Sequence, residues 1–295
     1  MKNVGGDPLP EMVGQIDSTV RPGQPFSVTF PPGVIPPSDA IAGRYFQVRC
    51  SSAVGIERAS DWSIFLRRPL FVCGRQQREH DDRWQFYLPN GTEEVAGRLQ
   101  ADAASDSNRA DAGHNWLAQR LQGENLNLDG PFGNGFSLQP GPHNLLLLVD
   151  VRHGPAWFWQ LLPLCEQALD RGGRVTILMR ADNDETTAGL VPSLPIQVEV
   201  GAAVNKKQWL EQIHDTVGWA DQVCAGIAPA DYGELLSIVR DARFRVDRNF
   251  AQILVRTDLL CGVGACLVCV IPKAGGGFTR ACVHGPVFDL TEISI

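Results

Sequence analysis

Four of the eight cysteines in this chain fall within its last 35 residues, in the order C-x4-C-x2-C-x12-C. The short gaps allow one loop to wrap three thiolates around a compact centre, and the distant fourth thiolate closes the site from another segment. Glycines between the first two cysteines remove side chains, so backbone N–H groups can approach and hydrogen-bond the inorganic sulfides of a cluster. This order is typical of a plant-type [2Fe–2S] centre. The candidate metal ligands are Cys261, Cys266, Cys269 and Cys282.

Two other interpretations of these cysteines remain open. A structural zinc site also uses four cysteines, but it usually pairs them as two C-x2-C units, which this sequence lacks. Reduced cysteines can also pack as small hydrophobic residues without binding a metal. A disulfide framework is disfavoured, because the N-terminus has no apolar segment typical of a signal peptide, and we therefore expect a cytoplasmic protein.

Charge and hydropathy exclude two further classes. The chain has 26 Lys and Arg residues against 33 Asp and Glu residues, and the positive charges are not clustered. Because nucleic-acid binding requires clustered positive charge, we expect no nucleic-acid partner. The longest aliphatic run, residues 145–149, is far too short to span a membrane.

The N-terminal half has the pattern of an antiparallel β-barrel. Short alternating segments at residues 25–30, 44–50 and 84–88 are separated by proline and glycine, and no amphipathic helix is evident among them. We assign residues 1–140 to this barrel domain. Residues 91–112 are rich in Ala, Asp and Ser and lack apolar periodicity, so we expect a mobile inserted loop there.

The pattern changes near residue 141 to alternating strands and helices. Continuous apolar runs are typical of buried parallel strands, and helix-like spacing follows the first and third of them. We predict an open parallel α/β domain over residues 141–245 and a cluster domain over residues 246–295. The predicted strands are residues 144–149, 175–179, 196–200 and 222–226, and the predicted helices are residues 157–169 and 209–216.

Three motifs carry a resemblance to a known family. These are the cysteine-rich tail with its closing segment 281–288, the glycine-rich segment Gly130-Pro131-Phe132-Gly133-Asn134-Gly135-Phe136, and the turn Arg67-Arg68-Pro69-Leu70. In this order they resemble the ferredoxin–NADP reductase superfamily with an appended cluster domain. More narrowly, the chain resembles the electron-transfer subunits of bacterial dihydroorotate dehydrogenase.

The resemblance implies an FAD site on the barrel. Arg68 would support the FAD phosphates, and Gly113-His114 stands where the family has a Gly-Thr pair that meets the pyrophosphate. Position 71 is Phe, where the family has a Ser or Thr that hydrogen-bonds the flavin ring. The implied FAD-binding residues are Arg68, Pro69, Leu70, Phe71, Phe86, Tyr87, Leu88, Gly113 and His114.

The resemblance also implies an NAD site, but the residues put it in doubt. The family has a run of glycines after the first α/β strand, which leaves space for dinucleotide phosphates. Here that stretch runs from Asp150 to Trp157 with one glycine, an added carboxylate and bulky aromatic side chains. The family's later Cys-Gly-Pro turn is Cys224-Ala225-Gly226 here, and Arg256 stands where the family has a Glu.

As a family member, the chain would be an electron-transfer subunit rather than the enzyme that acts on dihydroorotate. It would pass electrons between an FMN-containing dihydroorotate dehydrogenase catalytic subunit and NAD+ or another acceptor, through [2Fe–2S] and FAD, in pyrimidine biosynthesis. We assign no catalytic residue, since neither His153 nor His284 lies in a catalytic motif. The alternatives are a cluster-only scaffold or docking protein that has lost its flavin and NAD sites, and a zinc-stabilised interaction protein.

Overall fold

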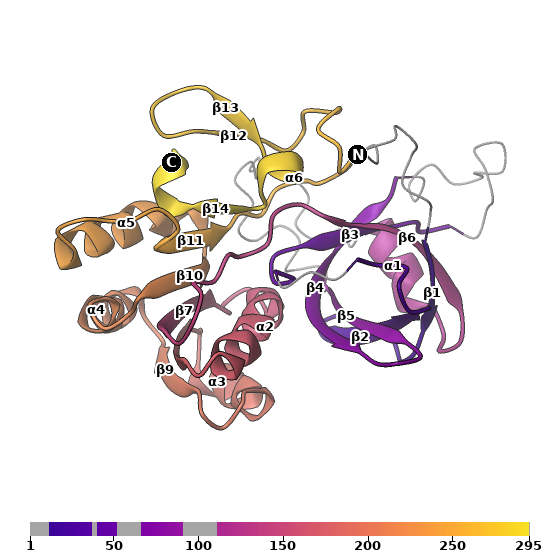
Figure 1. Cartoon of the computed structure of the whole chain (residues 1–295), viewed down its shortest axis with the longest axis horizontal. Helices are drawn as coiled ribbons and strands as arrows, with labels where there is room; N and C mark the ends of the chain where they lie inside the picture. The colour runs from indigo at the N-terminus through magenta and orange to yellow at the C-terminus, as the bar shows by residue number, and fades with distance from the viewer. Residues whose placement is uncertain (1–11, 37–39, 52–65, 91–110, 295) are drawn as a thin grey trace.

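The computed structural model describes residues 12–36, 40–51, 66–90 and 111–294. These residues form an antiparallel β-barrel, an open α/β sheet and a C-terminal tail that packs against both (Figure 1). The arrangement confirms the predicted fold class. The expected mobile insertion at 91–112 lies mostly outside the described residues, which resume at residue 111.

Six antiparallel strands close the barrel in the order β1-β2-β5-β4-β3-β6. Aromatic side chains fill its interior, where Phe46 meets Trp84 and Phe86 edge-on at ring-centroid distances of 5.1 and 5.2 Å. Alternation along the strands points these rings inward, as in other small barrels. The elements are β1 (Met12–Ile16), β2 (Gln24–Phe30), β3 (Tyr45–Val48), β4 (Arg68–Gln77), β5 (Asp82–Leu88), α1 (Ala112–Ala118) and β6 (Asn125–Phe132).

The second sheet has the order β14-β11-β10-β7-β8-β9, and all its strands are parallel except β14. Its central strand β7 is buried on both faces, which explains its unbroken aliphatic sequence. The strands are β7 (Asn144–Asp150), β8 (Arg174–Arg180), β9 (Glu199–Ala203), β10 (Gln222–Gly226), β11 (Ala251–Leu254) and β14 (Val287–Asp289).

Helices cover both faces of this sheet. Leu145 and Leu147 of β7 pack with α2, whereas Leu146 and Leu148 pack with α4 and α5. The helices are α2 (Ala156–Asp170), α3 (Asp184–Leu190), α4 (Lys206–Val217) and α5 (Tyr232–Ala242). None of the helices in the described ranges is both long and apolar enough to cross a membrane.

The cysteine-rich tail is an excursion between two neighbouring strands of the sheet. β11 and β14 pair antiparallel through Gln252–Leu254 and Val287–Asp289, and residues 255–286 leave and return between them. That excursion holds β12 (Val270–Pro272), β13 (Phe278–Arg280) and the short helix α6 (Ala281–His284). Figure 1 shows it in yellow, above both the sheet and the barrel.

Candidate functional site

The four C-terminal cysteines lie together as two thiol pairs. The Sγ atoms of Cys269 and Cys282 are 3.2 Å apart and buried, and Cys266 hydrogen-bonds the Sγ atom of Cys261 through its side chain. The side chain of Cys266 is exposed. In the part of the chain that the structure describes, no three His, Cys, Asp or Glu side chains form a site for a single metal ion. The structure thus places the four predicted ligands as two pairs, with Cys261 near enough to Cys282 to interact with it electrostatically.

Backbone N–H groups of the loop point at the sulfur atoms. Burial raises the pKa of the Cys261 thiol, but N–H groups of Cys266, Val263 and Ala265 hydrogen-bond its sulfur and bring the pKa down to about 6. Gly264 has φ +76°, and a Cβ atom there would lie 2.9 Å from the Val283 side chain. The glycine is required for this close turn, which holds the neighbouring backbone N–H groups near the Cys261 sulfur.

The barrel holds the cluster loop from the other side. The Tyr45 hydroxyl donates to the carbonyl of Cys282 at 3.4 Å, and the Gln47 side chain donates to the carbonyl of Leu259. The glycine-rich segment after β6 also reaches the tail, where Asn134 N–H donates to the carbonyl of Gly285 at 2.6 Å. A Cβ atom on Gly133 would lie 2.6 Å from Pro286, so this motif serves close packing between barrel and tail.

A pocket of about 270 Å³ opens where the barrel, α2 and the tail meet. We call it the junction pocket. Barrel residues line one side, α2 contributes Gln160, and the chain leading to Cys261 lines the rest. Since Leu260 precedes Cys261 directly, the pocket adjoins the cluster loop. Its lining is Leu66, Arg68, Pro69, Phe71, Pro89, Asp111, His114, Gln160, Arg256, Thr257, Asp258, Leu259 and Leu260.

Arg68 is held at the rim of this pocket by Asp111. Its Nε atom lies 2.7 and 2.9 Å from the two carboxylate oxygens, and Asp111 also accepts the backbone N–H of His114 at 3.0 Å. Burial raises the pKa of Asp111, but hydrogen bonds and charge from Arg68 and His114 together outweigh burial and keep the pKa below its ordinary value. Gly113 is required here, because a Cβ atom would lie 2.7 Å from the Arg68 side chain.

The structure separates the residues expected to bind FAD into two groups. Arg68, Pro69, Phe71 and His114 line the junction pocket. Leu70, Phe86 and Leu88 point into the barrel core, and Tyr87 packs with Cys73 and Ala156. The part of the expected site that lines the pocket is therefore Arg68, Pro69 and Phe71 of β4 together with His114 of α1.

Sequence reasoning missed the pocket residues that come from the other domain. Gln160 is 3% exposed and Thr257 follows β11, and buried polar atoms of both have no hydrogen-bond partner. A lone glutamine in the apolar helical run Ala156-Trp157-Phe158-Trp159-Gln160-Leu161-Leu162 is the signal that would have indicated the first of them. Thr257 carries no comparable signal.

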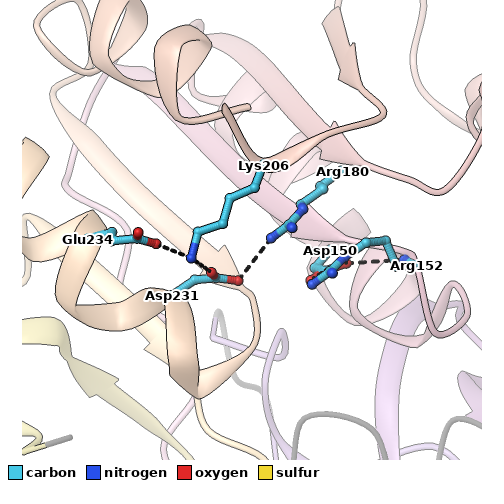
Figure 2. A network of polar contacts seen from close by, with 6 residues as sticks. All are labelled: Asp150, Arg152, Arg180, Lys206, Asp231 and Glu234. Carbon is cyan, nitrogen blue, oxygen red and sulfur yellow. Dashed lines mark hydrogen bonds and ion pairs between the residues drawn. The ribbon is translucent and has the colours of Figure 1, made fainter. Parts of the chain in front are cut away.

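The carboxyl edge of the parallel sheet, where dinucleotides bind in such folds, is neutralised by the chain's own ion pairs. The buried carboxylate of Asp150 accepts the backbone N–H of Arg152 at 3.1 Å and its guanidinium at 2.6 Å. Beside them, Asp231 is bound by Arg180 at 3.2 Å and Lys206 at 3.0 Å (Figure 2). The positive groups of Arg152, Arg180 and Lys206 are therefore already paired with carboxylates of the chain.

Aromatic packing also fills the space where glycines would admit a nucleotide. A Cβ atom on Gly226 would lie 2.6 Å from the Trp157 ring, so this ring lies directly against the end of β10. The Arg256 guanidinium covers the Trp157 ring at 4.3 Å from its centroid. With Asp150 where a pyrophosphate would need positive charge, these residues disfavour the binding of a pyridine dinucleotide.

The barrel, the open sheet and the cysteine tail define a class: ferredoxin-reductase-like folds with an iron–sulfur segment. An NADH-dependent reduced ferredoxin-NADP oxidoreductase superposes with a TM-score of 0.57 at 16% identity, over 95% of this chain and 89% of that one. Phthalate dioxygenase reductase gives 0.51 at 12% identity, over 94% and 77%. These likenesses concern the fold.

Sequence comparisons point to a narrower group of similar proteins. Residues 257–294, which contain all four clustered cysteines, match the iron-sulfur cluster binding domain of dihydroorotate dehydrogenase B. The electron transfer subunit of dihydroorotate dehydrogenase B (NAD(+)) from Bacillus cereus strain B4264 is 24% identical over 253 residues, which are 81% of this chain and 85% of the relative. The subunit from Bacillus mycoides strain KBAB4 matches to the same extent. The chain is similar to these subunits, which confirms the resemblance and the expected iron–sulfur segment.

Proposed function

We propose that this chain is an electron-transfer subunit. It carries electrons between an FMN-containing dihydroorotate dehydrogenase catalytic subunit and NAD+ or another acceptor, through [2Fe–2S] and FAD, in cytoplasmic pyrimidine biosynthesis. The observation that carries this proposal is the pairing of four thiols beside the junction pocket, within a segment that matches the cluster-binding domain. When bound, the cluster supplies one-electron transfer, and FAD interconverts one- and two-electron chemistry.

The chain's own residues suit such a cluster. Each iron of a [2Fe–2S] centre takes two thiolates, and the pairs Cys261 with Cys266 and Cys269 with Cys282 provide them. The N–H groups of the loop stabilise thiolate charge, as the lowered pKa of Cys261 indicates. The pocket suits part of FAD, because it combines the Arg68 guanidinium with the apolar wall of Phe71 and buried polar atoms that have no partner.

The catalytic subunit would dock on the exposed side of the cluster loop. Cys266 is exposed there, and the neighbouring side chains of Val263 and Leu267 are 47% and 59% exposed. Apolar side chains around a redox centre favour a close protein contact that excludes water. Docking at this face would bring the partner's FMN near the cluster, with the junction pocket on the inner side.

Anaerobic purification followed by absorption spectroscopy tests the function. We expect iron–sulfide bands together with flavin bands, both bleached by dithionite, and iron and FAD in the same sample. Iron–sulfide bands without flavin would instead support the cluster-only scaffold. A colourless protein that contains zinc would overturn the redox function.

Arg68→Ala tests the placement of the FAD phosphates. A guanidinium–phosphate contact is charge-assisted, and its loss leaves the Asp111 carboxylate facing the phosphates, so we expect FAD affinity to fall by at least about tenfold. The measurement is a fluorescence titration of apoprotein with FAD. Arg67→Ala is the matched control, because Arg67 pairs with Asp129 and does not line the pocket. Equal affinities in both variants would contradict the placement.

NADH is expected to be a poor reductant of this protein. Asp150 and Trp157 oppose pyrophosphate and nicotinamide binding, so the flavin absorption should persist in excess NADH and bleach when dithionite is added. Stopped-flow absorbance under anaerobic conditions measures this. Rapid and complete bleaching by stoichiometric NADH would show that the sheet edge rearranges to admit the nucleotide.

A further inference from the structure

Two residues that line the junction pocket each carry a buried polar atom without a hydrogen-bond partner. The atoms are Oε1 of Gln160, on the second turn of α2, and Oγ1 of Thr257, just after β11. The side chain of Gln160 is 3% exposed. Buried polar groups in native proteins are almost always hydrogen-bonded, so atoms of this kind require an explanation.

Packing alone does not explain Gln160. Its neighbours on the same face of α2, Ala156, Trp157 and Leu164, are buried and apolar, and a leucine at position 160 would suit the same surroundings. Leaving a buried carboxamide unsatisfied costs stability that an apolar residue of similar shape would not cost. The natural reading is that Gln160 is satisfied by a ligand.

The pocket lining indicates which kind of chemical group on a ligand would satisfy Gln160. A carboxamide presents a donor NH2 group beside an acceptor oxygen in either orientation, and a threonine hydroxyl can donate or accept. The two side chains therefore recognise a hydrogen-bonding pattern rather than a charge. Phe71 supplies an aromatic wall in the same pocket. The volume of about 270 Å³ suits one ring system, not a whole dinucleotide.

We infer that the carboxamide of Gln160, assisted by the hydroxyl of Thr257, hydrogen-bonds the pyrimidine edge of the flavin ring. That edge carries a ring N–H between two carbonyl oxygens, and a carboxamide can pair with a neighbouring N–H and carbonyl. This inference rests on the proposed binding of FAD. It places the polar contact to the ring on α2 and the segment after β11, in a chain where Phe71 on β4 cannot supply one.

Gln160→Leu separates this role from a structural one. A ligand contact predicts about tenfold weaker FAD binding, the size of one buried hydrogen bond, while the melting temperature of the apoprotein stays equal or rises. If Gln160 has only a structural role, the variant should instead lower the melting temperature of the apoprotein. Gln167→Leu, on the same helix but outside the pocket lining, is the matched control and should leave FAD affinity unchanged.

FAD methylated at N3 of the flavin ring provides an independent probe that needs no variant. It lacks the ring N–H, so the wild-type chain should bind it about tenfold more weakly than FAD, and Gln160→Leu should bind the two flavins with nearly equal affinity. Equal FAD affinity in the wild type and Gln160→Leu would overturn the inference while leaving the proposed function intact. A wild-type chain that binds no FAD would overturn the flavin part of the proposed function itself.

Discussion

Cys266→Ala is expected to abolish the iron–sulfur centre. The iron content should fall from about two atoms per chain to near zero, with loss of the iron–sulfide absorption bands, because the variant leaves one iron with a single thiolate. Cys266 is exposed, so its truncation removes little packing, and the far-UV circular dichroism of the barrel and sheet should be unchanged. Iron and sulfide assays on anaerobically purified protein measure the effect.

Cys165→Ala is the matched control for this experiment. Cys165 is fully buried in α2 and lies away from the cluster loop, so its replacement costs about 1 kcal/mol of packing and leaves the iron content unchanged. An unaltered iron content in Cys266→Ala would exclude Cys266 as a ligand. Loss of iron in both variants would point to general destabilisation instead.

Asp231→Asn is expected to lower the free energy of unfolding by about 3 kcal/mol. The carboxylate neutralises Arg180, and both side chains are almost completely buried, so the amide leaves an uncompensated guanidinium in a low-dielectric site. Lys206, which also binds Asp231, is 40% exposed and should contribute less to the loss. Urea unfolding followed by circular dichroism at neutral pH measures the change.

Glu211→Gln provides the comparison on the protein surface. Glu211 pairs with Lys207 across one helical turn of α4 at 3.8 Å, and both side chains are largely exposed. Its replacement should change the free energy of unfolding by less than about 0.5 kcal/mol. If Asp231→Asn had an equally small effect, the buried ion pairs at the sheet edge would not be a significant source of stability.

Local sequence patterns predicted four of the six strands of the second sheet, but not β11 and β14, which lie within the predicted cluster domain. The strand predicted at 222–226 coincides with β10, and that at 144–149 differs from β7 by one residue. The strand predicted at 196–200 is β9 at Glu199–Ala203 instead, and Ile196 is 96% exposed. β9 is an edge strand with small residues, so alternation of large apolar side chains is a weak guide to its position.

The grouping of the four cysteines was predictable from the sequence and the pocket was not, for the same physical reason. The four thiols lie in one short segment, so their spacing alone indicates the centre. The pocket combines β4, α1, α2 and the residues after β11, whose proximity depends on how the barrel packs against the sheet. Helix α1 was also missed, because its seven residues have little apolar periodicity and depend on Asp111 as an N-terminal cap.

The return of the tail to the sheet affects how the centre can be assembled. Pairing of Leu254 with Val287 joins the two ends of the 255–286 excursion through backbone hydrogen bonds alone. The entropy of closing this loop is therefore lost through the sheet itself and does not have to be offset by iron or sulfide binding. Insertion of the metal then needs to order only a loop whose two ends are already held by the sheet. The free energy of metal binding stabilises that loop more than it stabilises the barrel and the sheet. A chain stripped of iron would thus keep its scaffold and remain ready for reloading.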